Sequence, residues 1–459
     1  MSDVGGPSEL AAAPGEASHP ERLGVWALAW PSMAIFGLQS LVGLVDFVIV
    51  GTLGTQAVAG VGVATQFFNA VFAVLAAVTT GTIALVARAV GARDLAEADR
   101  VLRLSTLLGA LLGLCVSALA MPFTDSIVAA FGVEPAVVRL GSSYLRILLA
   151  FTVPFAVGFV IASGLRGAGD VRTPLLVGLV MNVVNVICNV TLVFGKLGFP
   201  ALGTDGSALA SGIAFTTSML LYLALWWRNR LALPRGAWRS GLTAARARRI
   251  LRIGLPTAAE QSAWQAGLWL FLRIVAHYGT EPVSAYLIGV RILSFSFVPG
   301  LGFSTAAATL VGQHLGAGRP ELATRSGWRA NKGAMAVMAC VGLAIIGVSR
   351  PVAGWFGATG STTVDLTVTF ISILGAAQPL MAVEFALGGA LRGAGDTRFP
   401  LLAILCGLFV FRLGGAILVS RVIGGTVVAV WSCLLADYLV KAALLSGRFA
   451  SGRWQEVRL

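Results

Sequence analysis

The stretch LRGAGDVRTPLL, residues 165–176, occurs a second time as LRGAGDTRFPLL, residues 391–402. The two copies lie 226 positions apart and differ at two positions. A second pair of matching segments, LVARAVGA beginning at Leu85 and LVGQHLGA beginning at Leu310, keeps almost the same spacing of 225. Matches at a nearly constant offset along the chain predict two homologous halves within one protein.

The composition places both halves in a membrane. Apolar residues make up 57% of the chain and charged residues 12%, and the mean hydropathy is +0.86. Soluble domains carry about 25% charged residues, so lipid is the expected solvent for this chain. The five cysteines show no CxxC spacing and the three histidines do not cluster, so neither a disulfide framework nor a resident metal site is predicted.

Twelve apolar runs are long enough to cross a bilayer, which requires about 20 residues for a helix. We expect helices rather than strands because the runs are long and do not alternate, and because lipid offers backbone groups no other partner. The predicted fold is an all-α integral membrane protein with two pseudo-symmetric lobes of six helices. The predicted spans are residues 24–50, 58–87, 102–122, 138–162, 174–194, 206–227, 250–276, 283–311, 331–349, 363–388, 400–420 and 425–446.

The basic residues indicate how the chain is oriented. Most of the lysines and arginines follow the even-numbered runs, above all between residues 228 and 252. Because cytoplasmic loops are enriched in basic residues, both termini and all even-numbered loops are predicted to be cytoplasmic. The net charge of +13 is then explained by topology, and no nucleic-acid partner is expected. We expect a multi-pass protein of the cytoplasmic membrane.

The predicted spans and loops divide the chain into five parts. These are a disordered cytoplasmic tail without a cleaved signal peptide at 1–22, an N-terminal lobe at 23–228, a basic cytoplasmic linker at 229–249, a C-terminal lobe at 250–447 and a cytoplasmic tail at 448–459. Six helices in each half give both halves the same orientation, and in transporters built this way the binding site lies between the repeats.

The repeated motif itself is predicted to be structural. Each copy falls after the fourth span of its half, on a predicted cytoplasmic loop. The glycines suit a tight turn, the arginines are expected to stay on the cytoplasmic side, and the proline suits the first turn of the next helix. The residues assigned to this structural role are Arg166, Asp170, Arg392 and Asp396.

With these motifs in place, the chain resembles the multidrug and toxic compound extrusion (MATE) transporters. The resemblance rests on the paired LRGAGD motifs, on VDFVIVGTLG at 45–54, LVARAVGA at 85–92 and NVVNVICNVTLVFG at 182–195, and on the closing RFASGRW. It implies two six-helix lobes in a V that opens alternately to either side. It also implies export of organic solutes, often cationic and amphipathic, driven by protons or Na⁺. We expect a monomer whose partners are the lipid bilayer and a small-molecule substrate, with no cofactor beyond the coupling ion.

One carboxylate in the first half has no counterpart in the second. Asp46 lies inside the first predicted span, and the position 225 residues later is Phe271. An ionisable residue within a span is costly to keep and is a functional candidate by default. Asn182, Asn185 and Asn189 share one face of the fifth span, and a buried carboxylate near neutral oxygens can bind a proton or a hard cation. The alternative is that the amides are only hydrogen-bonding contacts between helices.

The resemblance assigns roles to this group. Asp46 matches the aspartate that many family members use for cation coupling, Asn185 matches a site asparagine, and Ser211 matches a family threonine. Asn189 stands where many members have a second aspartate. The missing carboxylate makes the group less negative, which favours a proton over sodium as the ion at Asp46 without excluding either.

The second half has carboxylates of its own. Glu260 corresponds to Ile35, and Glu384 corresponds to Gly158 or Phe159. Both are candidate contacts for a cationic substrate, and Trp264, one turn after Glu260, is a candidate cation–π partner. The alternative is that the two glutamates pair within the lobe with Arg273, Arg291 or Arg412. Asp437 and Lys441, at i and i+4, are predicted to form a structural ion pair.

The predicted function is a proton- or sodium-coupled antiporter that exports organic, cationic or amphipathic compounds by alternating access. A second hypothesis is a flippase or exporter of lipid-linked or anionic metabolites. It is suggested by four arginines inside the spans, Arg146, Arg273, Arg291 and Arg412, because a cationic cavity favours phosphate. The chain has no HExxH or GxSxG motif, so an enzyme is not expected.

Overall fold

The computed structural model describes residues 24–457, apart from residue 235 and residues 237–240 and 356–360. The predicted tail at 1–22 lies outside the described residues. Over the part of the chain that is described, all regular structure is helical.

The N-terminal lobe contains six membrane spans. α5 and α6 meet at Phe151 with a bend of 54° and together form one span. α3 is followed at once by a short helical extension, which includes α4. The helices are α1 Val25–Gly51, α2 Thr55–Gly91, α3 Leu95–Ala120, α4 Thr124–Ala129, α5 Pro135–Ala150, α6 Thr152–Ala168, α7 Arg172–Phe194 and α8 Gly203–Trp227.

The C-terminal lobe repeats this order. One of its spans, residues 398–423, begins as α14 and continues through π-helical turns around α15. The helices are α9 Ala244–Val275, α10 Thr280–Gly316, α11 Pro320–Gly347, α12 Ser349–Trp355, α13 Ser361–Ala394, α14 Arg398–Leu405, α15 Gly415–Ile417 and α16 Val427–Ala450.

The twelve predicted spans correspond to these helices. Among the described residues, ten helical segments are long and apolar enough to cross a membrane alone, and the bent pair of α5 and α6 makes an eleventh. The twelfth, α9, is less apolar because polar residues, including Glu260, Gln261 and Gln265, interrupt it. α9 also begins at Ala244, within the predicted linker.

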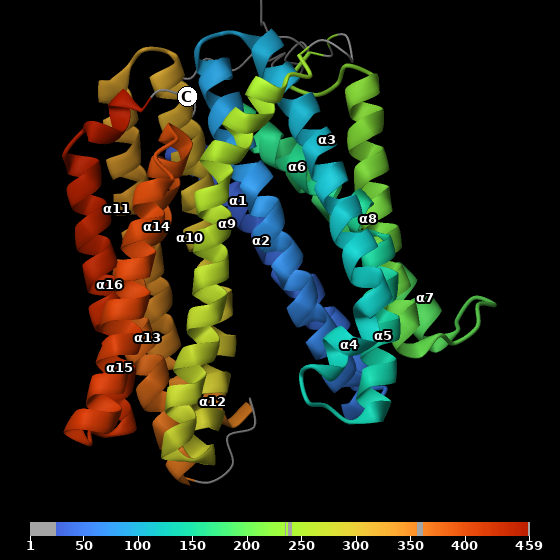
Figure 1. Ribbon diagram of the computed structural model, residues 1–459, viewed down its shortest axis with the longest axis vertical. Helices are drawn as coiled ribbons and strands as arrows, with labels where there is room; N and C mark the ends of the chain where they lie inside the picture. The colour runs from blue at the N-terminus through green and yellow to red at the C-terminus, as the bar shows by residue number, and fades with distance from the viewer. Residues whose placement is uncertain (1–23, 235, 237–240, 356–360, 458–459) are drawn as a thin grey trace, which may run out of the picture.

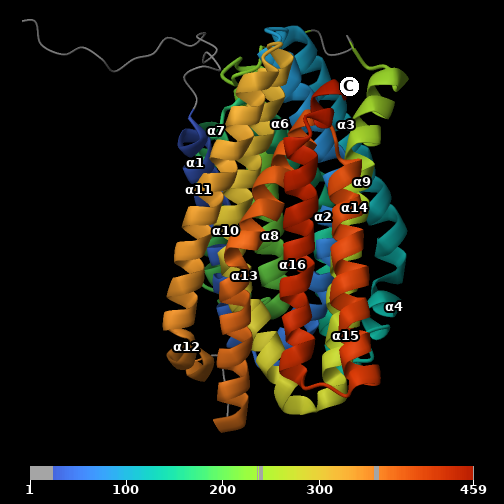
Figure 2. The same cartoon turned by 90° about the vertical axis from the view of Figure 1, so that its left-hand side faces the viewer.

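The two lobes lie side by side and separate toward one end of the bundle (Figure 1). They contact each other mainly through α1 with α10, and α2 with α9 and α10. Figure 2, turned by 90°, shows the long helices running roughly along the same axis. The end that carries the C-terminus and the turns after α6 and α13, which we call the motif end, is where the lobes come together.

Each lobe has its own apolar core. In the N-terminal lobe, Phe155 packs against Phe72 and Phe215 with ring centroids 4.8 and 4.9 Å apart. In the C-terminal lobe, Phe370 packs on the fully buried Trp431 at 4.9 Å. The cores also join the lobes, because Leu28 of α1 packs in the second core and Ile250 of α9 packs in a core cluster of the first lobe.

The repeated motif forms the same turn twice. Gly169 and Gly395 both have φ of +89°, a left-handed conformation that favours glycine. The N–H of the following aspartate donates to the leucine carbonyl that begins the motif, at 2.9 Å in both copies (Asp170 to Leu165, Asp396 to Leu391).

The prediction that the whole motif is a surface loop is wrong in one respect. Arg166 and Arg392 precede the turns and belong to the last turns of α6 and α13. Side chains on a helix point back toward its N-terminus, and both arginines extend into their lobes, with Arg166 only 5% exposed. Only the aspartates hold the turn region: Asp170 accepts a bond from the N–H of Thr173 at 3.0 Å, and Asp396 pairs with Arg448 at 2.8 Å.

The motif also joins the lobes. Arg88 at the end of α2 donates to the carbonyl of Ala394 at 3.2 Å, and Gln313 at the end of α10 donates to the carbonyl of Gly167 at 3.1 Å. Arg88 and Gln313 occupy equivalent positions, 225 residues apart. Each half therefore contributes one donor and one motif carbonyl to a reciprocal contact, which gives both copies a use.

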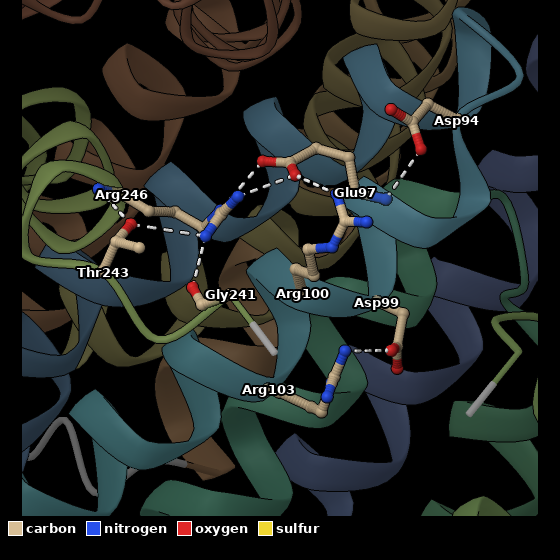
Figure 3. A network of polar contacts seen from close by, with 8 residues as sticks. All are labelled: Asp94, Glu97, Asp99, Arg100, Arg103, Gly241, Thr243 and Arg246. Carbon is tan, nitrogen blue, oxygen red and sulfur yellow. Dashed lines mark hydrogen bonds and ion pairs between the residues drawn. The ribbon is translucent and has the colours of Figure 1, made fainter. Parts of the chain in front are cut away.

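A polar network fastens the linker to the N-terminal lobe (Figure 3). Arg246, in the first turn of α9, binds Glu97 of α3 through two hydrogen bonds of 2.8 Å. Asp94 caps α3 by accepting from the N–H of Glu97 at 2.8 Å, and Asp99 pairs with Arg103 at 2.7 Å. The start of the second lobe is thus tied to the first at the motif end.

Candidate functional site

A cavity of about 250 Å³ lies inside the N-terminal lobe, between α1, α2, α6, α7 and α8. Phenylalanines from α2, α6 and α8 form much of its wall, and their rings pack against one another. Such a mostly apolar cavity with a few polar groups is typical of small-molecule sites. Its polar and charged wall residues include Gln39, Asp46, Arg166, Asn182, Asn185 and Ser211.

Four of the predicted site residues form one chain of hydrogen bonds. The amide of Asn189 donates to Asp46 Oδ1 at 2.7 Å and to Asn185 Oδ1 at 3.2 Å. The amide of Asn185 donates to Ser211 Oγ at 3.3 Å. Helices α1, α7 and α8 are joined by this chain, and Asp46, Asn185 and Ser211 reach the cavity wall.

The local sequence of α7 explains the arrangement. Asn182, Asn185 and Asn189 all lie on the buried side of this helix. The opposite side carries apolar residues that are exposed in the bundle, such as Val183 (50% exposed) and Ile187 (56%). A helix with lipid on one side and its neighbours on the other places its amides inward, because lipid cannot satisfy them.

The amides leave hydrogen-bonding capacity next to the carboxylate. Asn182 Oδ1 and Asn189 Oδ1 are buried acceptors that lack a donor among the described residues. Among the described residues, Asp46 is the only acidic residue that lines the cavity, and Asn189, which donates to it, brings a neutral amide oxygen close to the carboxylate. This arrangement can accept a proton on Asp46 or hold a small hard cation between carboxylate and amide oxygens.

The carboxylates of the C-terminal lobe are engaged in ion pairs. Glu260 binds Arg392 at 2.8 Å, and Arg392 also donates to Ser304 at 3.4 Å. Glu384 binds Lys441 at 3.1 Å. Pairing within the lobe was the alternative expected for both glutamates, but the expected partners were wrong. The partners are the motif arginine and a lysine on α16 rather than an arginine within α9, α10 or the α14 span.

Asp437 lies at the centre of the second of these networks. It pairs with Lys441 at 3.1 Å, which confirms the predicted i, i+4 ion pair, and it also binds Arg412. Asp437, Lys441 and Arg412 are almost fully buried. Trp264 does not extend this charged group; its ring packs edge-on against Phe297 at 6.1 Å.

The other span arginines have separate surroundings. Arg146 pairs with Asp125 at 3.4 Å, and both side chains are more than half exposed. The guanidinium of Arg291 lies 4.3 Å from the centre of the Phe47 ring, across the lobe boundary. Arg273 is exposed near the end of α9. These arginines do not converge on one pocket.

Sequence reasoning missed Arg166 as a cavity residue, since it was assigned to a loop. The offset between the halves held the signal: its equivalent, Arg392, binds Glu260, and Glu260 is replaced by Ile35 in the first half.

The chain is similar to known proteins over both of its lobes. The family model MatE matches residues 31–191 and 256–418, one segment in each lobe. A protein of Thermotoga maritima described as a probable multidrug resistance protein NorM is 29% identical over 438 residues, covering 94% of this chain and 92% of the relative. The uncharacterized transporter YisQ of Bacillus subtilis is 22% identical and covers 94% of each chain.

Solved structures share the fold. A MOP superfamily transporter from Pyrococcus furiosus, described as having a binding pocket of reversed polarity, superposes with a TM-score of 0.88 at 23% identity, covering 95% of this chain and 97% of that one. An outward-facing MATE transporter of the same superfamily gives 0.87 at 22%, with the same coverage. With a family match across both lobes and this shared twelve-helix fold, the chain belongs to the MatE family and is a multi-pass membrane transporter of the MATE type.

Proposed function

We propose that the protein is a cation-coupled antiporter that exports organic cationic or amphipathic compounds across the cytoplasmic membrane by alternating access. The observation that carries this proposal is the hydrogen-bonded chain from Asp46 to Ser211 in the wall of the N-lobe cavity. Relatives described as multidrug resistance proteins support the export of varied organic compounds. One copy of the chain supplies both lobes, so a monomer is the expected working unit.

The charge distribution supports the proposed orientation. The motif end, where the lobes meet, is also where the basic linker residues lie, such as Arg246. The enrichment of basic residues in cytoplasmic loops supports placing this end and both termini in the cytoplasm. With the motif end in the cytoplasm, the separation of the lobes toward the other end corresponds to a state that is open to the outside.

The coupling step rests on charge neutralisation. A carboxylate in an apolar cavity is costly while charged, so a proton or Na⁺ arriving from outside lowers that cost. A bound organic cation competes for the same negative charge. The coupling ion and the organic cation then bind Asp46 in turn. This links inward ion flow to outward export, provided that the transporter switches between its outward-open and inward-open states only when the charge of Asp46 is compensated.

The second hypothesis, export of anionic or lipid-linked metabolites, was based on four span arginines. Arg412 pairs with Asp437 and Arg146 pairs with Asp125, so two of the four are compensated by carboxylates and offer no support for a cationic cleft. We therefore retain the first function.

The test is transport by purified protein in liposomes. A proton gradient or a Na⁺ gradient is imposed separately, and movement of a fluorescent organic cation is followed. We expect one of the gradients to drive transport, and Asp46→Asn to reduce it to the level of empty liposomes. Asp125→Asn, a matched change at an exposed aspartate, serves as the control. Coupled transport that survives Asp46→Asn would contradict the proposal.

A further inference from the structure

Arg166 is a buried cation that faces the N-lobe cavity without a carboxylate partner in the described part of the chain. It is 5% exposed and lines the cavity. Its Nη2 donates to Ser163 Oγ at 2.7 Å, and its guanidinium lies 5.8 Å from the ring centre of Phe36 and 6.0 Å from that of Phe159. Its Nε is buried and has no acceptor among the described residues.

The second lobe shows how such an arginine is normally satisfied. Arg392, the equivalent residue, binds Glu260 at 2.8 Å. The residue equivalent to Glu260 is Ile35, which is 5% exposed and lines the N-lobe cavity. In one lobe the protein supplies the carboxylate, and in the other an isoleucine and an open space stand in its place.

Asp46 does not take over this role. Phe36, which contacts Arg166, precedes Asp46 by ten residues on α1, which is about 15 Å along a helix. The carboxylate of Asp46 is held instead by Asn189. The cavity therefore has a positive group and a negative group at separate places, and phenylalanine rings also line its wall.

Resting on the proposed function, we infer that the N-lobe cavity selects organic cations that also carry a carboxylate, and that Arg166 binds this carboxylate. A guanidinium matches a carboxylate geometrically and forms charge-assisted hydrogen bonds with it. A buried charge without a partner is costly, so a ligand that supplies the missing anion gains more here than it would at the surface. The substrate class is then zwitterionic, with the apolar body against the phenylalanines.

Two compounds test this selectivity directly. N-methylnicotinate and N-methylnicotinamide share one ring and one permanent cation and differ only in a carboxylate or an amide. Equilibrium binding of each radiolabelled compound to the purified protein in lipid nanodiscs gives a ratio of affinities. We expect wild type to bind the carboxylate compound at least about tenfold more tightly, since hydrogen bonds between charged groups are stronger than those to a neutral amide.

The decisive variant copies the second lobe into the first. Ile35→Glu places a carboxylate where Glu260 stands, and we expect it to pair with Arg166 and to bring the ratio to one or below. Ile35→Gln is the matched control, with nearly the same shape and no charge, and it should keep the preference. Arg166→Gln removes the guanidinium and should also abolish the preference, with thermal unfolding used to show that each variant is folded.

The outcomes separate this inference from the proposed function. Equal affinities in wild type, or loss of the preference in Ile35→Gln as large as in Ile35→Glu, would overturn the role of Arg166. If Asp46-dependent dye export persists in that case, the proposed function stands. If neither compound binds to folded wild type and no dye moves, both are wrong. A preference present in wild type and lost only with Ile35→Glu and Arg166→Gln supports the inference.

Discussion

In the C-terminal lobe the arginine of the repeated motif has a carboxylate of its own, whereas in the N-terminal lobe the same arginine lines a cavity. Arg392 is bound by Glu260, and Glu384 binds Lys441. The positions equivalent to the two glutamates in the first lobe are Ile35 and either Gly158 or Phe159, all of which line the cavity. Thus the space filled by ion pairs in one lobe is kept open in the other.

The residues that are repeated in both lobes and the residues that differ between the lobes have different roles. The turns, the glycines and the donor–carbonyl contacts between lobes are repeated, and they hold the two lobes together at the motif end. Asp46, Asn185 and Asn189 are unrepeated, and they meet in the cavity of one lobe only. Functional asymmetry arises on a symmetric scaffold by changing a few buried side chains.

The largest expected effect is the loss of stability on breaking the ion pair between Glu260 and Arg392, which has no counterpart in the first lobe. Glu260→Gln leaves Arg392 without its counter-charge, and removal of one partner from a buried pair costs about 3–5 kcal/mol. Because Arg392 is 17% exposed, we expect about 3 kcal/mol of unfolding free energy, measured by denaturant unfolding in detergent.

Two further variants sharpen that result. Glu281→Gln, at an exposed glutamate in the first turn of α10, is the control and should have little effect. The double variant Glu260→Ile with Arg392→Leu removes both charges and should recover most of the lost stability, since apolar replacement of a whole buried pair is often neutral. A single variant as stable as wild type would show that the pair does not stabilise this lobe.

Much of the fold could be predicted from the sequence. The length of apolar runs predicts the spans, the constant offset between matching segments predicts the two halves, and the position of basic residues predicts the cytoplasmic loops. The inward face of α7 was predictable for the same reason: Asn185 and Asn189 follow helical spacing, and their spacing alone places them together. The bend between α5 and α6 at Phe151 was not predictable, because the segments on both sides of it are apolar and form one continuous run in the sequence.

The partners of the charged residues were harder to predict. Glu260 and Arg392 are separated by 132 positions, and helical periodicity carries no information about contacts between distant helices. Arg166 was misplaced because a motif rich in glycine was treated as a loop throughout, although its first four residues finish α6. A long side chain at a helix end can still reach the interior.

A second prediction makes the site of the first lobe more negative. Asn189→Asp places a carboxylate 2.7 Å from Asp46, where the amide now donates. Two adjacent carboxylates cannot both stay charged without a bound cation or a shared proton, and added carboxylates strengthen the binding of hard cations. We expect the Na⁺ concentration for half-maximal transport to fall about tenfold, which corresponds to about 1.4 kcal/mol.

Transport measured over a range of Na⁺ concentrations at constant pH tests this change. Asp205→Asn, at an aspartate of α8 that bonds to Ser143 at 2.8 Å and does not line the cavity, is the control for altered charge in the same lobe. A Na⁺ response identical to that of wild type would argue that Asn189 lies outside the ion path.

The smallest effect concerns the part that the lobes share. Gln313→Ala removes one reciprocal contact, from Gln313 to the carbonyl of Gly167, and a hydrogen bond contributes about 1 kcal/mol. Because this contact exists only while the motif end is closed, its loss should raise the population open at that end by about fivefold. Distances between spin labels on the motif ends of α3 and α11 measure the population.

Gln455→Ala, which removes a bond to Thr324 within one lobe, is the control and should leave the distances unchanged. Arg88→Ala removes the equivalent donor together with a bond to the carbonyl of Val457, so it should shift the population further in the same direction. A shift produced by Gln455→Ala but not by Gln313→Ala would contradict the role of the repeated motif in holding the two lobes together.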